Sequence, residues 1–418
     1  MLGHRRSVCT LLIACIAMLA FAAPTALAQR PTTWRCKHVL ATDGVTWLDD
    51  VVLTTLGHIL SVEPAKPDQK VDRDFGDAWL IPGLIDLHTH LLLKPYDQMT
   101  WDDQVRSESN ELRTLRASKH AFDTLRAGFV AIRDLGTEGA DYADVALRAA
   151  VREGHVRAPR LFVATRAIVA RGCYGPDPEN PATKKGAQPV SGLAEIRAAV
   201  REQAAGGADW IKVYADYRHG NSGPVAATFT SEELQALCDE AAKAKLPVAA
   251  HATTDEGIRR AVEAGVRTIE HGAGASPATL RLMCEKGVVL CPCLAATEAI
   301  VRYAGHRGPI VDRLNVGKLG FQRALAAGVT IACGSDAGVF VHGQNARELE
   351  LMVAYGMTPA QALAAATRVA AKVLGTEEFG QIRPGARGFV VLADDPLRDI
   401  TALRNLRAVV RDGDEVQN

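Results

Sequence analysis

The stretch that decides the fold is Ile81 to His90, IPGLIDLHTH. It is an apolar run that closes on two histidines, His88 and His90, with one residue between them. Successive side chains of a β-strand point to opposite faces, so residues two apart point the same way. Imidazole nitrogens are common ligands of zinc and similar ions. The stretch therefore predicts a buried strand that delivers two metal ligands into one cavity.

The same pattern, an apolar run that ends on a polar residue, recurs along the rest of the chain. Four more candidate ligands end such runs: Lys212, His251, His271 and Asp336. The runs 129–136, 160–169 and 288–294 complete a set of eight, and amphipathic segments such as 193–207 and 231–245 separate them. Alternating strand and helix signals predict an α/β protein with parallel strands, here a (β/α)8 TIM barrel. In such barrels the active site lies at the carboxyl ends of the strands, where these residues fall.

Several motifs together resemble the amidohydrolase superfamily. Residues 82–90, PGLIDLHTH, are similar to the family's PGxIDxHxH signature, and residues 334–338, GSDAG, to its GTDxG signature. With KVYADY at 212–217, HGQNARELELM at 342–352 and IRPGARGFVVLADDP at 382–396, the pattern resembles the branch that contains Xaa-Pro dipeptidases and ochratoxin-hydrolysing carboxypeptidases. The resemblance runs from about Val39 to the C-terminus.

The resemblance implies a binuclear site, with two divalent ions, Zn²⁺ by expectation. His88, His90 and Asp336 would hold the more buried ion, and His251 and His271 the second. Lys212 would bridge both ions as a carboxylated lysine, because an ammonium group cannot ligate a cation. Two metals lower the pKa of a shared water. Asp336 would take the proton of that water and return it to the leaving amine, as the catalytic residue.

Four further polar residues are candidate substrate contacts. Tyr217 follows the fourth run, and its alternative is a tyrosine packed on the rim; His342 follows the eighth, and its alternative is a cap for the next helix. Arg171 and Tyr174 lie in the loop after the third run, where related dipeptidases often carry Gly-His-Gly with its histidine near the substrate carboxylate. This chain lacks that histidine. Arg133 and Asp134 are expected to form a buried ion pair.

The function expected is release of a C-terminal amino acid from dipeptides or N-acyl amino acids, including ochratoxin A cleaved to L-phenylalanine and ochratoxin alpha. A cyclic-amide or lactone hydrolase using the same metal site is the alternative. A metal-binding protein without catalysis is a third reading, which the retained Asp336 opposes. The formal net charge of zero excludes a nucleic-acid binding surface recognisable by bulk charge, and we expect a homo-oligomer.

The two ends of the chain carry other signals. Residues 1–28 read as a signal peptide with Arg5 and Arg6, an apolar core and an A-x-A site, which predicts a periplasmic or secreted enzyme with no membrane span after cleavage. Residues 29–80 and 376–418 carry short strand patterns, and the resemblance implies that they form one small β-sandwich beside the barrel at 81–375. The cysteines left after cleavage lie mostly in apolar runs and are interpreted as small buried hydrophobes.

Overall fold

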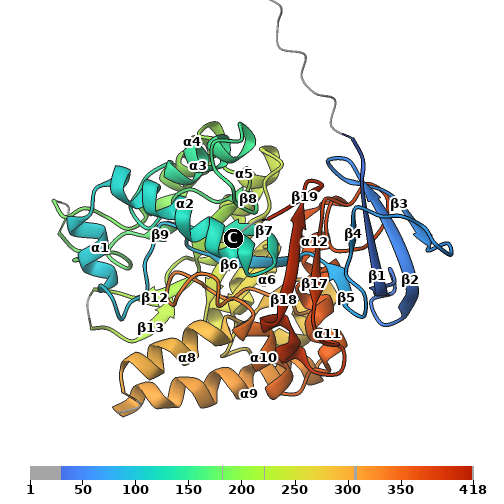
Figure 1. Cartoon of the computed structure of the whole chain (residues 1–418). Coiled ribbons are helices and arrows are strands. Elements are labelled where there is room, and N and C mark those ends of the chain that lie inside the picture. The colour runs from blue at the N-terminus through green and yellow to red at the C-terminus, as the bar shows by residue number, and fades with distance from the viewer. Residues whose placement is uncertain (1–29, 181, 221, 306–307, 417–418) are drawn as a thin grey trace, which may run out of the picture.

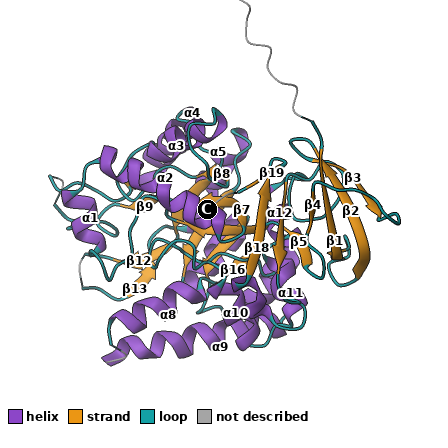
Figure 2. Cartoon of the chain, viewed as in Figure 1, coloured by secondary structure: helices purple, strands orange, loops and turns teal. Residues whose placement is uncertain are grey.

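The computed structural model describes residues 30–180, 182–220, 222–305 and 308–416, in an α/β arrangement (Figure 1). Parallel strands form two sheets at its centre (Figure 2). The first sheet has the order β6 (Leu84–Thr89), β7 (Phe129–Asp134) and β8 (Arg160–Val163). The second has the order β10 (Gln188–Val190), β9 (Ile168–Ala170), β11 (Ile211–Tyr214), β14 (Val248–Ala252), β15 (Thr268–His271) and β16 (Val289–Cys291).

Backbone hydrogen bonds connect the two sheets. On one side, Trp210 N–H donates to the carbonyl of Val163 at 3.2 Å, which links β8 to the start of β11. On the other side, the segment 330–337 binds both β16 and β6: Leu290 N–H donates to Thr330, and Leu87 N–H donates to Cys333, each at 2.9 Å. The run ending at Asp336 was predicted as a strand, and in the structure it forms only isolated bridges to its two neighbours.

The third predicted run, 160–169, is also not one strand. Thr165 has a φ of 57°, a left-handed conformation that a regular strand does not accommodate, and it separates β8 from β9. The segment after β9 was predicted as a loop, and within it the short strand β10 pairs with β9.

Helices lie between successive strands and around the sheets. They are α1 (Trp101–Ser107), α2 (Asn110–Arg126), α3 (Ala143–Arg152), α4 (Gly192–Ala205), α5 (Ser231–Lys243), α6 (Asp255–Ala264), α7 (Pro277–Lys286), α8 (Leu294–Tyr303), α9 (Asp312–Ala326), α10 (Arg347–Ala354), α11 (Pro359–Ala365) and α12 (Arg368–Leu374), with the 3-10 turns η1 (Gly308–Val311) and η2 (Ile400–Arg404). Helix α5 begins with a capping box between Thr230 and Glu233, which satisfies backbone N–H groups of its first turn. Its buried face, including Leu234 and Leu237, packs into the core that surrounds the strands.

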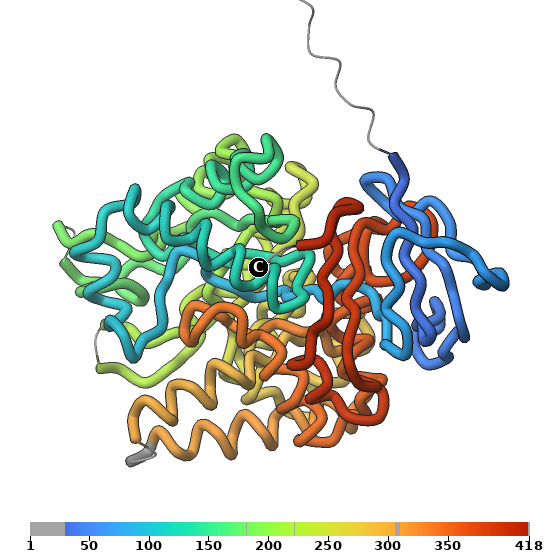
Figure 3. The backbone as a smooth tube through the Cα atoms, in the orientation of Figure 1, coloured from blue at the N-terminus to red at the C-terminus, as the bar shows by residue number. Residues whose placement is uncertain are grey.

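A separate eight-stranded sheet combines the two ends of the described chain, to the right in Figures 1 and 3. Its order is β19 (Asp414–Glu415), β18 (Leu406–Arg411), β17 (Gly388–Leu392), β5 (Trp79–Pro82), β1 (Thr32–Leu40), β2 (Trp47–Thr55) and β3 (Ile59–Pro64), with β4 (Arg73–Asp74) paired to β1. Trp34 packs edge-on against Phe389 in its core, at 5.7 Å between ring centroids. That this sheet makes a β-sandwich stays a prediction.

Among the described residues, no helix is both long and apolar enough to cross a membrane. The predicted signal peptide, residues 1–28, lies outside the described residues. Seven cysteines are described, all with free thiols, and all but Cys284 are buried, in agreement with their interpretation as apolar packing residues.

Candidate active site

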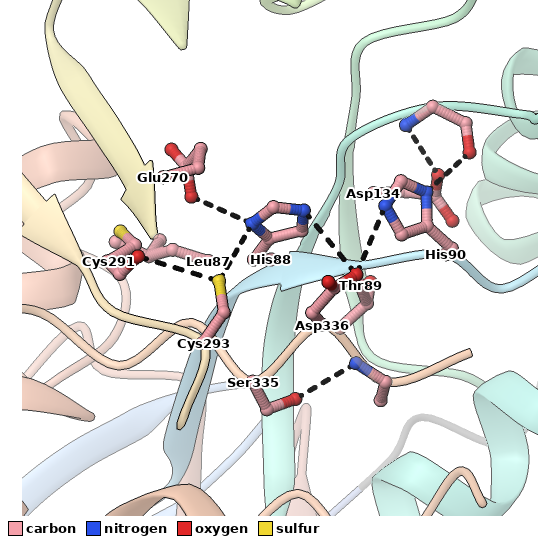
Figure 4. Close-up of polar contacts among 12 residues, drawn as sticks. Leu87, His88, Thr89, His90, Asp134, Glu270, Cys291, Cys293, Ser335 and Asp336 are labelled. Carbon is pink, nitrogen blue, oxygen red and sulfur yellow. Dashed lines mark hydrogen bonds and ion pairs between the residues drawn. The ribbon is translucent and has the colours of Figure 1, made fainter. Parts of the chain in front are cut away.

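Asp336 lies between the two histidines of β6 (Figure 4). Its Oδ1 is 3.6 Å from Nε2 of His88 and 3.3 Å from Nε2 of His90. All three side chains are nearly buried. Strand β6 supplies His88, and His90 follows its last residue with its ring on the same side, as the spacing predicts; the segment after Ile331 brings the carboxylate to them. The three groups thus aim their free ligand atoms at a common point.

Hydrogen-bond partners of the two Nδ1 atoms determine that each histidine directs its Nε2 at this common point. His88 Nδ1 lies 2.9 Å from Oε2 of Glu270, and His90 Nδ1 lies 2.9 Å from the carbonyl oxygen of Gly136. An Nδ1–H that donates to these oxygens leaves the lone pair on Nε2, directed at Asp336. Ligand histidines in metal sites are commonly oriented by such hydrogen bonds.

Glu270 also corrects the prediction for Arg133. Arg133 was expected to pair with Asp134, but its Nη2 binds Oε1 of Glu270 at 2.8 Å, and both side chains are fully buried. Asp134 instead accepts the backbone N–H of Leu91 at 2.8 Å. The reason is strand alternation: neighbours on β7 point to opposite sides, so Arg133 reaches across to Glu270 of β15 while Asp134 does not.

Lys212 is the member of the set with the least ordinary surroundings. It lies on β11 with 1% of its surface exposed, and its Nζ has no hydrogen-bond partner among the described residues. Burial lowers the pKa of this amine, against the opposing effect of the Glu270 and Asp336 carboxylates. A buried amine without a hydrogen-bond partner is costly in a protein core, so the position calls for a further chemical partner.

His251 and His271 end β14 and β15, and their rings lie 4.6 Å apart, with the ring of His271 5.5 Å from that of His88. Burial lowers the pKa of both imidazoles, that of His271 to about 3, and the positive charge of Lys212 adds to the shift. Both rings are therefore neutral at pH 7, the form that binds metals. His271 has a φ of 70° and Asp336 a φ of 63°, strained conformations of the kind that gather at functional sites.

Asp86, two residues before His88, connects β6 to the segment that carries Asp336. Its Oδ1 accepts the backbone N–H groups of His88 and Ser335, each at 3.0 Å, and its Oδ2 accepts the side-chain amide of Asn345 at 2.8 Å. This fully buried carboxylate holds β6 against the segment of Asp336. The ligand geometry thus depends on a residue that the motif PGLIDLHTH contains but that binds no metal.

Cys293 is a contact that the sequence did not reveal. Its Sγ lies 3.2 Å from Nδ1 of His88, and it forms a compact cluster of potential ligand atoms, within 4.8 Å of one another, with His88, His271 and Asp336. Burial raises the pKa of this thiol far above its usual value, which keeps it protonated and a poor ligand. Cys293 contacts Nδ1 of His88, the ring nitrogen that faces away from Asp336, and so helps to hold the imidazole in place.

A cavity of about 560 Å³ opens over these ligands. Its walls include His88, His90, His251, His271 and Asp336, so the five groups face one space, with Lys212 buried beneath. Tyr217 and Tyr174 line it, as expected of substrate contacts. The Tyr174 hydroxyl donates to Glu138 at 2.6 Å, and Trp101 Nε1 donates to the same oxygen at 2.8 Å.

The other two predicted substrate contacts do not line this cavity. Arg171 turns outward to Glu195, at 2.7 Å, and lines a separate cavity on the far side of Tyr217. His342 is buried, with Nε2 at 3.0 Å from the carbonyl of Leu93 and its ring stacked on His120. Neither residue lines the cavity above the candidate ligands. The path of a loop decides which of its side chains reach a cavity, and the spacing of residues in the sequence does not encode that path.

Residues from four other places contribute to the wall. Glu138 and Tyr96 come from loops after β7 and β6, and the hairpin of β12 (Asp216–Arg218) and β13 (Val225–Ala227) contributes Val225. The antiparallel pair α8 and α9, at the bottom of Figure 1, closes the opposite side with Ile300 and Val316. The cavity therefore combines a polar floor with partly apolar sides, typical of a small-molecule site.

Comparison with known proteins accords with this arrangement. A sequence profile of the amidohydrolase family matches residues 79–416. The chain belongs to the amidohydrolase family. Ochratoxinase of Aspergillus niger is 30% identical over 369 residues, which span 79% of this chain and 73% of the relative. The structure of a Xaa-Pro dipeptidase with bound methionine matches with a TM-score of 0.81 and 28% identity, and that of a prolidase complexed with N-methylphosphonate-L-proline with 0.82 and 28%; each match covers 93% of this chain and 100% of the other. The family and these relatives identify the fold as a TIM-barrel α/β fold and support assignment of the chain as a hydrolase.

Proposed function

We propose that this chain is a zinc-dependent amide hydrolase that releases a C-terminal amino acid from dipeptides or N-acyl amino acids, ochratoxin A among them. The observation that carries the proposal is the buried Lys212 amine, which has no hydrogen-bond partner among the described residues and lies beneath a cavity lined by four histidines and Asp336. Membership of the amidohydrolase family and similarity to ochratoxinase and prolidases support it.

The residues present fit two divalent ions. His88, His90 and Asp336 would hold one, and His251 and His271 the other. The neutral Lys212 amine would form an N–C bond to carbon dioxide and lose one proton, and the resulting carbamate anion would bridge the pair. This reaction would give the orphaned nitrogen a partner and add the negative charge that two cations require. When bound, the ions would polarise the amide carbonyl and lower the pKa of a water molecule.

Asp336 would move the proton. Its Oδ1 lies 3.6 Å from Nε2 of His88 and 3.3 Å from Nε2 of His90, and burial raises its pKa to about 6, above the usual value of 3.8. A base whose pKa is near neutrality both accepts and returns a proton readily. Asp336 would take the proton of the attacking water and deliver it to the leaving amine nitrogen, which departs poorly unless protonated. Tyr217, at the cavity wall, would donate a hydrogen bond to the substrate.

The test is hydrolysis by the full chain, purified and loaded with zinc in the presence of bicarbonate. The panel contains dipeptides, N-acyl amino acids including ochratoxin A, hydantoins and lactones. We expect amide cleavage that chelation abolishes and zinc restores, with two ions per chain by metal analysis. Ring opening without cleavage of any linear amide would favour the cyclic-amide or lactone alternative. Zinc-loaded protein that cleaves nothing would refute the proposal.

A further inference from the structure

Two arginines stand at the wall of the active-site cavity, and neither has an acidic partner. Arg313, in the first turn of α9, makes no side-chain hydrogen bond, ion pair or ring contact within the described ranges. Arg218, at the end of β12, has only the face of Tyr217, with 5.9 Å from its guanidinium carbon to the ring centroid. A guanidinium without an acidic partner beside a metal-ligand cluster is a candidate for binding an anionic part of a ligand.

The position of Arg313 follows from the helix pair. Arg313, Val316 and Gly317 are spaced as one face of α9, and all three line the cavity. Helix α8 packs against α9 and presents Ala296 and Ile300 to the same space. An unpaired cation thus stands beside an apolar surface, including Val316, which is 49% exposed. A cation next to an exposed apolar patch matches a ligand that has a carboxylate next to an apolar side chain.

The placement of the two arginines favours Arg313 over Arg218, because Arg313 shares a cavity-lining face of α9 with Val316, whereas Arg218 lies against the ring of Tyr217. Burial raises the pKa of the Tyr217 phenol, and the positive charges of Arg218 and Arg313 oppose that shift. Arg313 lines the same cavity as Tyr217 and the candidate metal-ligand histidines. Asp312 also lines the wall, and it makes no ion pair with either arginine.

We propose that Arg313 binds the free α-carboxylate of the amino acid that is released, and that Val225, Ile300 and Val316 contact its apolar side chain. This inference rests on the proposed function and narrows it to amides with a C-terminal carboxylate and an apolar last residue. Arg171 lies in the loop where related dipeptidases often have a histidine. It is paired with Glu195 and does not line the active-site cavity. A guanidinium fork binds a carboxylate through two parallel N–H···O bonds, and so fixes the direction of the substrate.

The kinetic test uses N-benzoyl-L-phenylalanine and its C-terminal carboxamide, which differ only in the anionic group. In the zinc-loaded wild type we expect the acid to be preferred. Arg313→Gln should raise KM for the acid roughly ten- to hundred-fold, with a smaller change in kcat, and leave the carboxamide unaffected, since a charge-assisted bond is lost. Arg313→Lys should recover part of the loss. Lys318→Gln, which removes a charge from the same helix away from the cavity, is the matched control.

A binding measurement separates this inference from the proposed function. Thermal shift of the zinc-loaded protein is recorded with L-phenylalanine and with L-phenylalaninamide. Stabilisation by the acid that Arg313→Gln abolishes and Lys318→Gln retains supports the inference, even if no substrate is cleaved and the proposed function fails. An acid preference that survives in Arg313→Gln, that disappears in Arg218→Gln instead, or that is absent from the wild type, would overturn it, even with full hydrolysis.

Discussion

Replacing Lys212 by methionine should stabilise the metal-free protein while it destroys the metal site. The Nζ is buried without a partner, and a buried unsatisfied donor costs about 1–3 kcal/mol. Methionine fills a similar volume with no polar hydrogen to satisfy. For the 390 residues that remain of the 418 when the 28 of the predicted signal peptide are left out, an unfolding entropy of about 2.1 cal/mol/K per residue corresponds to roughly 0.8 kcal/mol/K. The gain then raises the Tm of the metal-free protein by roughly 1–4 °C.

The assay is thermal unfolding by circular dichroism in chelator and carbon-dioxide-depleted buffer, repeated with zinc and bicarbonate. Zinc should raise the Tm of the wild type and leave Lys212→Met unchanged, since a ligand stabilises only the state that binds it. Lys70→Met, at an exposed lysine, is the control and should shift neither value. Lys212→Ala is a poorer choice because the cavity it leaves would mask the gain.

The pH dependence provides a second readout. Burial lowers the pKa of Lys212 in the folded state, so between that value and the unfolded value of about 10.4 the unfolded chain binds more protons. The stability contributed at this site therefore rises with pH across that window in the metal-free wild type, and Lys212→Met should lose this rise. A methionine variant that binds two zinc ions normally, or that melts well below the wild type without metal, would show that the amine is already satisfied and that no bridge forms.

Three further outcomes are expected. Asp336→Asn should lower kcat by about 10²–10⁴ in protein shown by metal analysis to keep both ions, and near-normal turnover would mean that another group moves the proton. Zinc retention, measured by dialysis and metal analysis, should weaken as pH falls below about 6, where Asp336 becomes protonated, and not near 3, where His271 titrates. Arg133→Met should destabilise the fold by about 3–5 kcal/mol in denaturant titration, because it leaves the buried Glu270 without its cation; adding Glu270→Gln should recover part of the loss, and an unchanged midpoint would contradict the pairing.

The ligand cluster was predictable from sequence because parallel strands place their carboxyl ends at one edge. Residues at the ends of β6, β11, β14 and β15 meet there whatever the lengths of the connecting loops. Spacing also fixed that His88 and His90 share a face. The strand ending at Asp336 was less predictable, since its residues form only bridges, yet the hydrogen bonds of Asp86 bring Asp336 to the same place.

The cavity walls could not be predicted in the same way. Arg171 and His342 were expected there from their position in loops after strands, but side-chain direction in a loop depends on partners distant in the sequence, here Glu195 and Leu93. Arg313 was not anticipated at all, because it belongs to a helix of the connection that follows β16 rather than to a strand end. Only the packing of α8 on α9 brings it to the cavity.

Burial explains both the shifted pKa values of the groups in this site and the folding free energy that the unsatisfied Lys212 amine costs. Taking the ligand groups out of water keeps His251 and His271 neutral, raises the pKa of Asp336 and lowers that of Lys212, so each group is shifted toward its uncharged form. Neutral imidazoles and a neutral amine are the forms that bind metal and react with carbon dioxide. The same desolvation leaves the Lys212 amine without a hydrogen-bond partner in the metal-free chain. The carbamate and metal bonds that would assemble the site would therefore also remove this cost to folding. Metal binding should therefore stabilise the wild-type fold, whereas the rim, where Arg313 is exposed, is free to change specificity at little cost in stability.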